Sequence, residues 1–354
     1  MYVNASLSKA AAAAKALLIL AASILLIVFS EGSREGIAQG IRLCLEVLVP
    51  SLFPFMAVTD LFVKSGLCNR AGKLLKKPAA VLFGISGSLA PVLLLSLIGG
   101  YPAGASGIAA LRKQEMISED DAKKAAMFAV CAGPGFVVNY VGCSVYHNRE
   151  IGLVILLAQI LSVIITGVGM RLLTKPTSYN SAKENSAFPI PFSTALVASV
   201  QTAAKGMLQI CAFVLLFSAV TGICTQLIHS QTALSAVYCT ADVCTAVIQL
   251  SEQYPIELVA FAIGFGGMCV HFQIFAVLEG IHINKPLFFL IRIIQGLLTA
   301  GLTHIGLRMI VRETAVFSSA VAEHAASFGG SALSGAAVVA VCICFLITLK
   351  PYRR

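Results

Sequence analysis

Runs of about 20 apolar residues, the length that a helix needs to cross a bilayer, recur along this sequence of 354 residues. In lipid every backbone polar group must find its partner within the protein, which leaves helices and closed barrels as the spanning structures. The chain is 58% hydrophobic and only 12% charged, whereas soluble domains are about one-quarter charged. We therefore expect an all-α polytopic protein of the cell membrane.

The net charge of +9 does not indicate nucleic-acid binding. The basic residues lie in short clusters between apolar runs, which is how cytoplasmic loops are marked. Lys9 and Lys15 favour a cytoplasmic N-terminus, and the cluster from Lys64 to Lys77 marks an internal loop. The first apolar run resembles a signal peptide, but it has no convincing small-residue cleavage site before Glu31, so we expect a retained span.

Spans and loop charges together predict a topology. The expected spans are 11–30, 37–63, 122–145, 151–172, 207–228, 257–281, 287–310 and 331–349. Two further stretches are expected to be re-entrant helical hairpins, 79–111 from the inside and 232–250 from the outside.

The expected crossings divide the chain into two repeats of opposite orientation. The predicted units are an N-terminal span (1–36), a first repeat (37–173), a polar linker with an amphipathic approach to the membrane (174–200), a second repeat (201–312), and a C-terminal span with a basic tail (313–354). Residues 55–59 (FMAVT) and 217–221 (FSAVT) differ only at their second position, a short trace of duplication. Inverted repeats place a solute site near the bilayer midplane.

Two apolar stretches are interrupted by glycine, at residues 130–136 (VCAGPGF) and 264–271 (GFGGMCVH). Backbone opened at membrane depth is tolerated only where protein or a water-filled cavity covers it. Paired interruptions in two halves of a chain are the best sequence indication of a transporter's binding site.

The candidate substrate-binding residues belong to the two hairpin turns and the two interruptions. They are Gly100, Tyr101, Pro102 and Gly104; Gly133, Pro134, Gly135 and Asn139; Thr240 and Asp242; and Gly266, Gly267, His271 and Gln273. Half-helix N-termini offer free amides and a positive dipole end, and ionisable groups inside a membrane are functional candidates.

Each of these groups also has a structural interpretation. The glycines can form a helix-packing seam, and the proline can simply kink a helix. His271 can be a hydrogen-bonded core residue, and Asp242 can lie in a solvated external loop.

No motif of a known enzyme class is present. The sequence has no HExxH helix, no Walker A loop and no G-x-S-x-G elbow, so we expect no catalytic residues, cofactor or metal. The eleven cysteines form no CxxC pair, which favours small packing residues over a disulfide framework or zinc site. A coupling proton or sodium ion is left open.

Four motifs resemble those of the nucleoside-recognition (Gate) domain membrane proteins, in particular the sporulation integral membrane proteins of the YlbJ type. The motifs are 50–55 (PSLFPF), 100–105 (GYPAGA), 118–136 (SEDDAKKAAMFAVCAGPGF) and 264–273 (GFGGMCVHFQ). The resemblance implies a Gate-type fold with two inverted repeats, related to concentrative nucleoside transporters. In this chain Thr240, Asp242 and Thr245 stand where the family has a glutamate followed by threonine and glycine.

The first functional hypothesis is a transporter or facilitator of a small polar solute. The resemblance implies a sporulation context, a membrane surrounding the forespore, and as solute a small heterocyclic anion such as dipicolinate, or a nucleoside. The lipid bilayer is the other expected partner, and a homo-oligomer is left open. The alternative is a non-transporting membrane assembly protein needed for spore formation, and an intramembrane hydrolase using Ser106 and His271 is a distant third.

Overall fold

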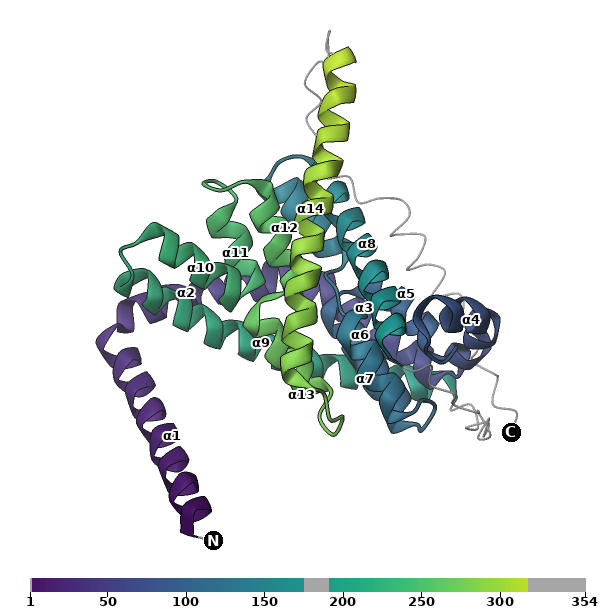
Figure 1. Cartoon of the computed structure of the whole chain (residues 1–354), viewed down its shortest axis with the longest axis horizontal. Coiled ribbons are helices and arrows are strands. Elements are labelled where there is room, and N and C mark those ends of the chain that lie inside the picture. The colour runs from purple at the N-terminus through teal and green to yellow at the C-terminus, as the bar shows by residue number, and fades with distance from the viewer. Residues whose placement is uncertain (1, 175–190, 318–354) are drawn as a thin grey trace, which may run out of the picture.

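The computed structural model describes residues 2–174 and 191–317, which are helical almost throughout (Figure 1). The linker residues 175–190, the predicted span 331–349 and the basic tail lie outside the described residues. The elements are α1 (Tyr2–Val28), α2 (Ser30–Leu43), the π-helix η1 (Cys44–Leu48), α3 (Val49–Lys64), α4 (Leu67–Phe83), α5 (Leu89–Gly99), α6 (Tyr101–Lys113), α7 (Glu119–Phe128), the π-helix η2 (Gly135–Val145), α8 (Arg149–Leu173), α9 (Phe192–Leu227), α10 (Gln231–Ala241), α11 (Val243–Leu250), α12 (Ile256–Phe265), α13 (Gly267–Val277) and α14 (Lys285–Phe317).

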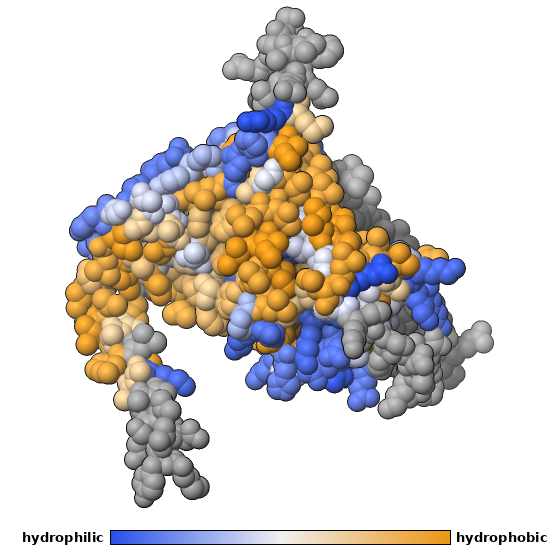
Figure 2. All heavy atoms as spheres, in the orientation of Figure 1, coloured by the Kyte–Doolittle hydropathy of each residue, from blue (hydrophilic) through white to orange (hydrophobic). Residues whose placement is uncertain are grey.

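Five helical stretches in the described part of the chain are long and apolar enough to cross a membrane. They are Ser30–Lys64, Arg149–Leu173, Phe192–Leu227, Ile256–Val277 and Lys285–Met309. They coincide with five of the spans expected from the sequence. Hydrophilic residues gather on two opposite sides of the molecule, with an apolar band between them (Figure 2). The chain is a helical, multi-pass membrane protein.

Several predicted boundaries differ from the structure. The helix expected to start at residue 37 begins at Ser30. The stretch 122–145 is not one helix, because α7 ends at Phe128 and η2 begins at Gly135. The second half begins with one continuous helix from Phe192, so the amphipathic approach and the following span form a single element. The predicted hairpin 79–111 starts within α4, and its two arms are α5 and α6.

The continuous helix from Ser30 to Lys64 packs antiparallel against α9. Glycine permits the closest approach near its beginning, where a Cβ on Gly36 would lie 2.0 Å from the carbonyl oxygen of Ser218. At the other end, Nζ of Lys64 donates to Oγ1 of Thr202 at 3.0 Å. Small residues let membrane helices approach to backbone contact, which is how this pair gains its packing energy.

The helices α8 and α14 form a second antiparallel pair through polar side chains. Oγ1 of Thr299 donates to Oγ of Ser162 at 3.1 Å, and Nε2 of Gln295 donates to Oγ1 of Thr166 at 2.9 Å. The residue number rises on α8 as it falls on α14, so the two helices run in opposite directions. These hydrogen bonds satisfy polar groups that lie in apolar spans.

The short helices α5 and α6 form one hairpin, and α10 and α11 form another. In the first, a Cβ on Gly104 would lie 2.6 Å from Oγ of Ser96, and one on Gly107 would lie 2.6 Å from Cγ1 of Val92. These contacts make the arms antiparallel. The second hairpin turns at Asp242, which ends α10 and begins α11.

Candidate functional site

The turn of the first hairpin contacts the first interruption. Gly100 joins α5 to α6 with a φ of 82°, a left-handed conformation that favours glycine. A Cβ at this position would also lie 3.1 Å from the amide nitrogen of Gly133, in the non-helical segment between α7 and η2. The motif GYPAGA therefore allows the turn and the opened backbone to meet at contact distance.

The turn of the second hairpin contacts the second interruption in the same way. Gly266 and Gly267, between α12 and α13, have φ values of 92° and 74°. A Cβ on Gly267 would lie 3.1 Å from Cα of Asp242 and from the amide nitrogen of Val243. Each hairpin turn is thus paired with one broken helix.

Asp242 is the N-cap of α11. Its Oδ2 accepts hydrogen bonds from the backbone amide of Thr245 at 2.9 Å and from that residue's hydroxyl at 3.0 Å. The residue is only 1% exposed. Asp242 therefore does not lie in a solvated loop, and the hairpin turn carries a carboxylate into the protein interior.

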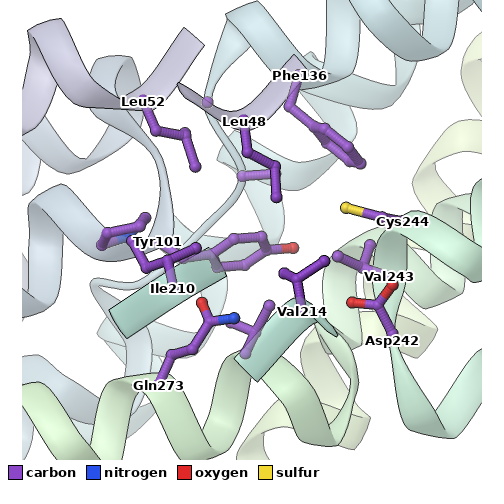
Figure 3. A pocket seen from close by; sticks show the side chains of 14 residues that line it. Leu48, Leu52, Tyr101, Phe136, Ile210, Val214, Asp242, Val243, Cys244 and Gln273 are labelled. Atoms are coloured by element: carbon purple, nitrogen blue, oxygen red, sulfur yellow. The ribbon is translucent and has the colours of Figure 1, made fainter. Parts of the chain in front are cut away.

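One cavity lies where the two turns and the two interruptions converge (Figure 3). Its volume is about 30 Å³, room for one or two water molecules. Apolar atoms form almost all of its wall, and Tyr101, Gln273 and Asp242 contribute the polar side chains. The lining residues are Leu48, Leu52, Tyr101, Pro102, Ala132, Gly133, Phe136, Ile210, Val214, Asp242, Val243, Cys244, Val270 and Gln273.

Tyr101 connects the two halves of the site. It lies directly after the first hairpin turn, and its hydroxyl donates to the carbonyl oxygen of Ile263 in α12. The guanidinium carbon of Arg292 lies 5.8 Å from the centre of its ring, within cation–π range. The tyrosine ring therefore forms part of the cavity wall while its hydroxyl holds the end of α12.

Sequence reasoning missed Arg292, which lies in α14 and is 1% exposed. Its guanidinium donates to the carbonyl oxygens of Val130 (2.5 Å), Gly264 (3.0 Å) and Phe265 (3.1 Å). A fourth hydrogen bond goes to Oε1 of Gln295 at 2.5 Å. One side chain thus bonds buried carbonyl oxygens at the ends of both interrupted helices.

These carbonyls need a partner because each helix stops where they lie. The last four carbonyl groups of a helix receive no hydrogen bond from within the helix. In lipid there is also no water to donate one. Nε2 of Gln295 provides for another of them, the carbonyl oxygen of Phe128, at 3.2 Å. The signal in the sequence was an arginine within the predicted span 287–310, which is itself an indication of function.

The structure brings only part of the predicted set to the cavity. Tyr101, Pro102, Gly133, Asp242 and Gln273 line it, while Gly100 and Gly267 form the backbone contacts behind it and Gly266 lies against the side chains of Arg292 and Tyr101.

The other predicted residues lie elsewhere. Asn139 and Thr240 are exposed, and the Thr240 hydroxyl bonds the carbonyl of Ala236 in its own helix. Gly104 packs inside the first hairpin, and Pro134 and Gly135 begin η2 beside Ser51.

His271 lies behind the cavity. It is fully buried, and its ring makes edge contacts with Phe265, Phe288 and Phe289, with centroids 4.7–5.2 Å apart. Its Nε2 lies 2.8 Å from the carbonyl oxygen of Phe265, and Nδ1 has no hydrogen-bond partner. In this conformation the histidine contacts α14 and the end of α12, on a different face of α13 from Gln273.

Within the described residues, no group of three or more His, Cys, Asp or Glu side chains is arranged to hold a metal ion. Asp242 carries the one carboxyl group among the described residues that line the cavity. The site is accordingly an apolar chamber with one carboxylate, one amide and one tyrosine ring.

The chain is similar to the sporulation integral membrane protein YlbJ of Bacillus subtilis (strain 168). The two are 24% identical over 315 residues, which cover 76% of each chain. No protein-family model matches the chain, and no solved structure matches it. The relative is named as an integral membrane protein, in agreement with the five apolar helical stretches.

Proposed function

We propose that this protein is a transporter or facilitator of a small polar solute. The observation that carries the proposal is the composition of the cavity wall. Both hairpin turns and both interrupted helices contribute to it, through Tyr101, Gly133, Asp242 and Gln273. Transporters with repeated halves bind their solutes in this kind of place, between discontinuous helices at the interface of the halves.

The order and direction of the elements support a Gate-type fold with two inverted repeats. Each half contains a long helix, a hairpin, an interrupted helix and a second long helix in that order, and the first half has α4 as an additional helix before its hairpin. The corresponding long helices pack against each other antiparallel, α2–α3 with α9 and α8 with α14. Two repeats related by a two-fold axis in the membrane plane have opposite orientations in the membrane. Equivalent helices of the two repeats that pack against each other at this axis therefore run antiparallel.

The cavity chemistry favours an uncharged heterocycle over an anion. The carboxyl group of Asp242 can accept hydrogen bonds from a solute, and no basic side chain that would attract an anion is among the described lining residues. The amide of Gln273 can both donate and accept, since within the described part of the chain its Nε2 bonds only the weak acceptor Sγ of Cys269, at 3.2 Å. A nucleoside is therefore our first candidate solute, and a dipicolinate-like anion is the second.

A solute of this size needs a wider chamber than the structure contains. Binding pockets for such molecules measure about 300–1,000 Å³, against about 30 Å³ here. The hairpin turns are the segments whose displacement opens the chamber, because each is joined to its interrupted helix by contacts rather than by chain continuity. We accordingly assign the structure to a contracted state of the transport cycle, in a protein that acts in the membranes of a sporulating cell, as its relative's name indicates.

Uptake into liposomes tests the proposal. Purified protein is reconstituted, and entry of labelled uridine, adenosine and dipicolinate is compared with entry into empty liposomes. We expect nucleoside uptake, reduced about tenfold or more by Asp242→Asn, because losing one charge-assisted hydrogen bond costs about 1.5–3 kcal/mol. Asparagine also caps helices, so α11 should remain folded. Thr240→Ala is the matched control, since that side chain is exposed and lies off the cavity.

Two results would reject the nucleoside proposal. Uptake of dipicolinate but not of nucleosides would assign the anion instead. If no solute enters, and Asp242→Asn leaves sporulation intact in the native organism, the protein is a membrane assembly protein rather than a transporter.

A further inference from the structure

Interrupted helices in membranes commonly create cation sites. The C-terminal end of a half-helix carries the negative end of its dipole, and unwound carbonyls there coordinate a coupling ion such as Na⁺. Two such ends occur in this protein, that of α7 near Val130 and that of α12 near Phe265. Which cation these carbonyls hold decides whether this part of the molecule couples to an ion gradient.

The geometry places Arg292 at the shared position of these two ends. Its guanidinium bonds one carbonyl oxygen after α7 and two at the end of α12, at 2.5–3.1 Å. All four of its hydrogen bonds, including the one to Gln295, go to uncharged oxygen atoms. No carboxylate is among these partners, so the helix ends themselves balance the charge.

The partial charges at the helix ends are comparable in size to the charge of the Arg292 guanidinium. A helix end carries about half an elementary charge, so the two C-terminal ends offset up to about one guanidinium charge, less the opposite contribution of the N-terminal ends of η2 and α13 beyond the breaks. A buried arginine without such compensation would be very unfavourable. A guanidinium also has a fixed planar fork, which suits carbonyls arriving from two directions.

We propose that Arg292 is a resident cation that occupies the position where an ion-coupled transporter would bind sodium. The carbonyls of Val130, Gly264 and Phe265 are consequently closed to a mobile ion, and Arg292 is a positioning residue that holds the two interrupted helices beside the cavity. One consequence of this assignment is that solute uptake does not depend on sodium bound at this position, and this consequence rests on the proposed function. The assignment of the cation itself does not.

Thermal unfolding of the purified protein tests the assignment without any transport measurement. The midpoint Tm is measured in NaCl, KCl and choline chloride at equal ionic strength. We expect the same Tm for the wild-type protein in all three salts. Arg292→Ala should lower Tm by ~5–10 °C in choline, because it leaves several buried carbonyls without donors. Millimolar guanidinium or Na⁺ should then raise the Tm of this variant, while leaving that of the wild type unchanged.

Two further variants make the experiment decisive. Arg292→Lys keeps the charge with fewer donors, so its Tm should lie between those of the wild type and Arg292→Ala, with no response to Na⁺. Arg308→Ala removes an exposed arginine of the same helix and should change neither Tm nor its salt dependence. If Arg292→Ala does not fold, a sodium response of the lysine variant or of the wild type overturns the proposal. If it folds and neither guanidinium nor Na⁺ raises its Tm above the value in choline, the proposal is also overturned.

Discussion

At Gly267 two separate requirements for glycine coincide. Its φ of 74° is in the left-handed region, and its missing side chain leaves the space into which the Asp242 turn packs. Gly280 meets only the first requirement, since its φ is 88° but no atom lies within 4 Å of a Cβ placed there. Substitutions at Gly267 and Gly280 therefore distinguish the cost of the left-handed conformation from the cost of steric contact.

We expect Gly267→Ala to lower stability more than Gly280→Ala does. The left-handed conformation costs alanine about 1–2 kcal/mol at either position, and crowding against Asp242 adds about 1–3 kcal/mol at Gly267 alone. Thermal unfolding of the two variants in the same detergent measures the difference. Equal losses of Tm would show that the hairpin turn and the interrupted helix are not in contact in solution.

At the scale of elements, a glycine seam joins the two long helices of the apolar band. Gly36 and Gly222 bring the backbones together so closely that a Cβ on Gly222 would lie 2.1 Å from the carbonyl oxygen of Gly32. Van der Waals contact of this kind replaces the hydrophobic effect, which is absent between helices in lipid. The close approach of the two helices therefore requires that these positions lack a Cβ atom.

Gly36→Ala should separate the helix pair and destabilise the protein by about 1–3 kcal/mol, because the seam can relax only by moving backbone. Gly169→Ala, in α8, is the control, since no atom lies within 4 Å of a Cβ there. Alanine is the better helix former by about 0.5–1 kcal/mol, so the control should be neutral or slightly stabilising. Unfolding midpoints of both variants measure the contrast, and a stabilising Gly36→Ala would contradict the seam.

Hydropathy and turn chemistry predicted the elements well because they are local properties of the chain. The spans, the Gly-Pro turn after Gly99 and the interruption at Gly266 all follow from residue types over short windows. The direction in which side chains point does not follow from short windows of sequence. The turn at an interruption sets the rotation of the next helix about its own axis. Gln273 therefore faces the cavity while His271 faces Phe288.

The partners of Arg292 illustrate the same limit. Its acceptors lie up to 162 positions away in the sequence, and they are backbone carbonyls, which every residue has. An arginine in a membrane span indicates that it has a hydrogen-bond partner, but the sequence does not show which groups are the partners. The start of α9 was missed for a simpler reason, because residues 192–206 are less apolar than the span they continue.

For the whole molecule, loop charges predict that the two hairpins open toward opposite sides of the membrane. Figure 2 shows hydrophilic residues on two opposite sides of the structure, as a protein that spans a membrane requires. Lys113 ends the first hairpin and Glu252 follows the second, and both are exposed. These two positions are therefore suitable for reporting orientation.

In a cysteine-free background, Glu252→Cys should react with a membrane-impermeant maleimide in intact cells. Lys113→Cys should react only after the cytoplasmic side is opened, because it lies among internal basic residues. Removal of the native cysteines is required, since Cys143 is exposed. Labelling of both positions from the same side would exclude inverted halves.

The helix α9 has 36 residues and so measures about 54 Å, against a hydrocarbon core of about 30 Å. Figure 1 shows it running across the direction of α14 rather than alongside it. Such a helix adapts to its membrane by leaning, and a change in lipid chain length changes the lean. Because α9 contributes Ile210 and Val214 to the cavity wall, and its partner helix contributes Leu48 and Leu52, we expect the width of the chamber to change with bilayer thickness.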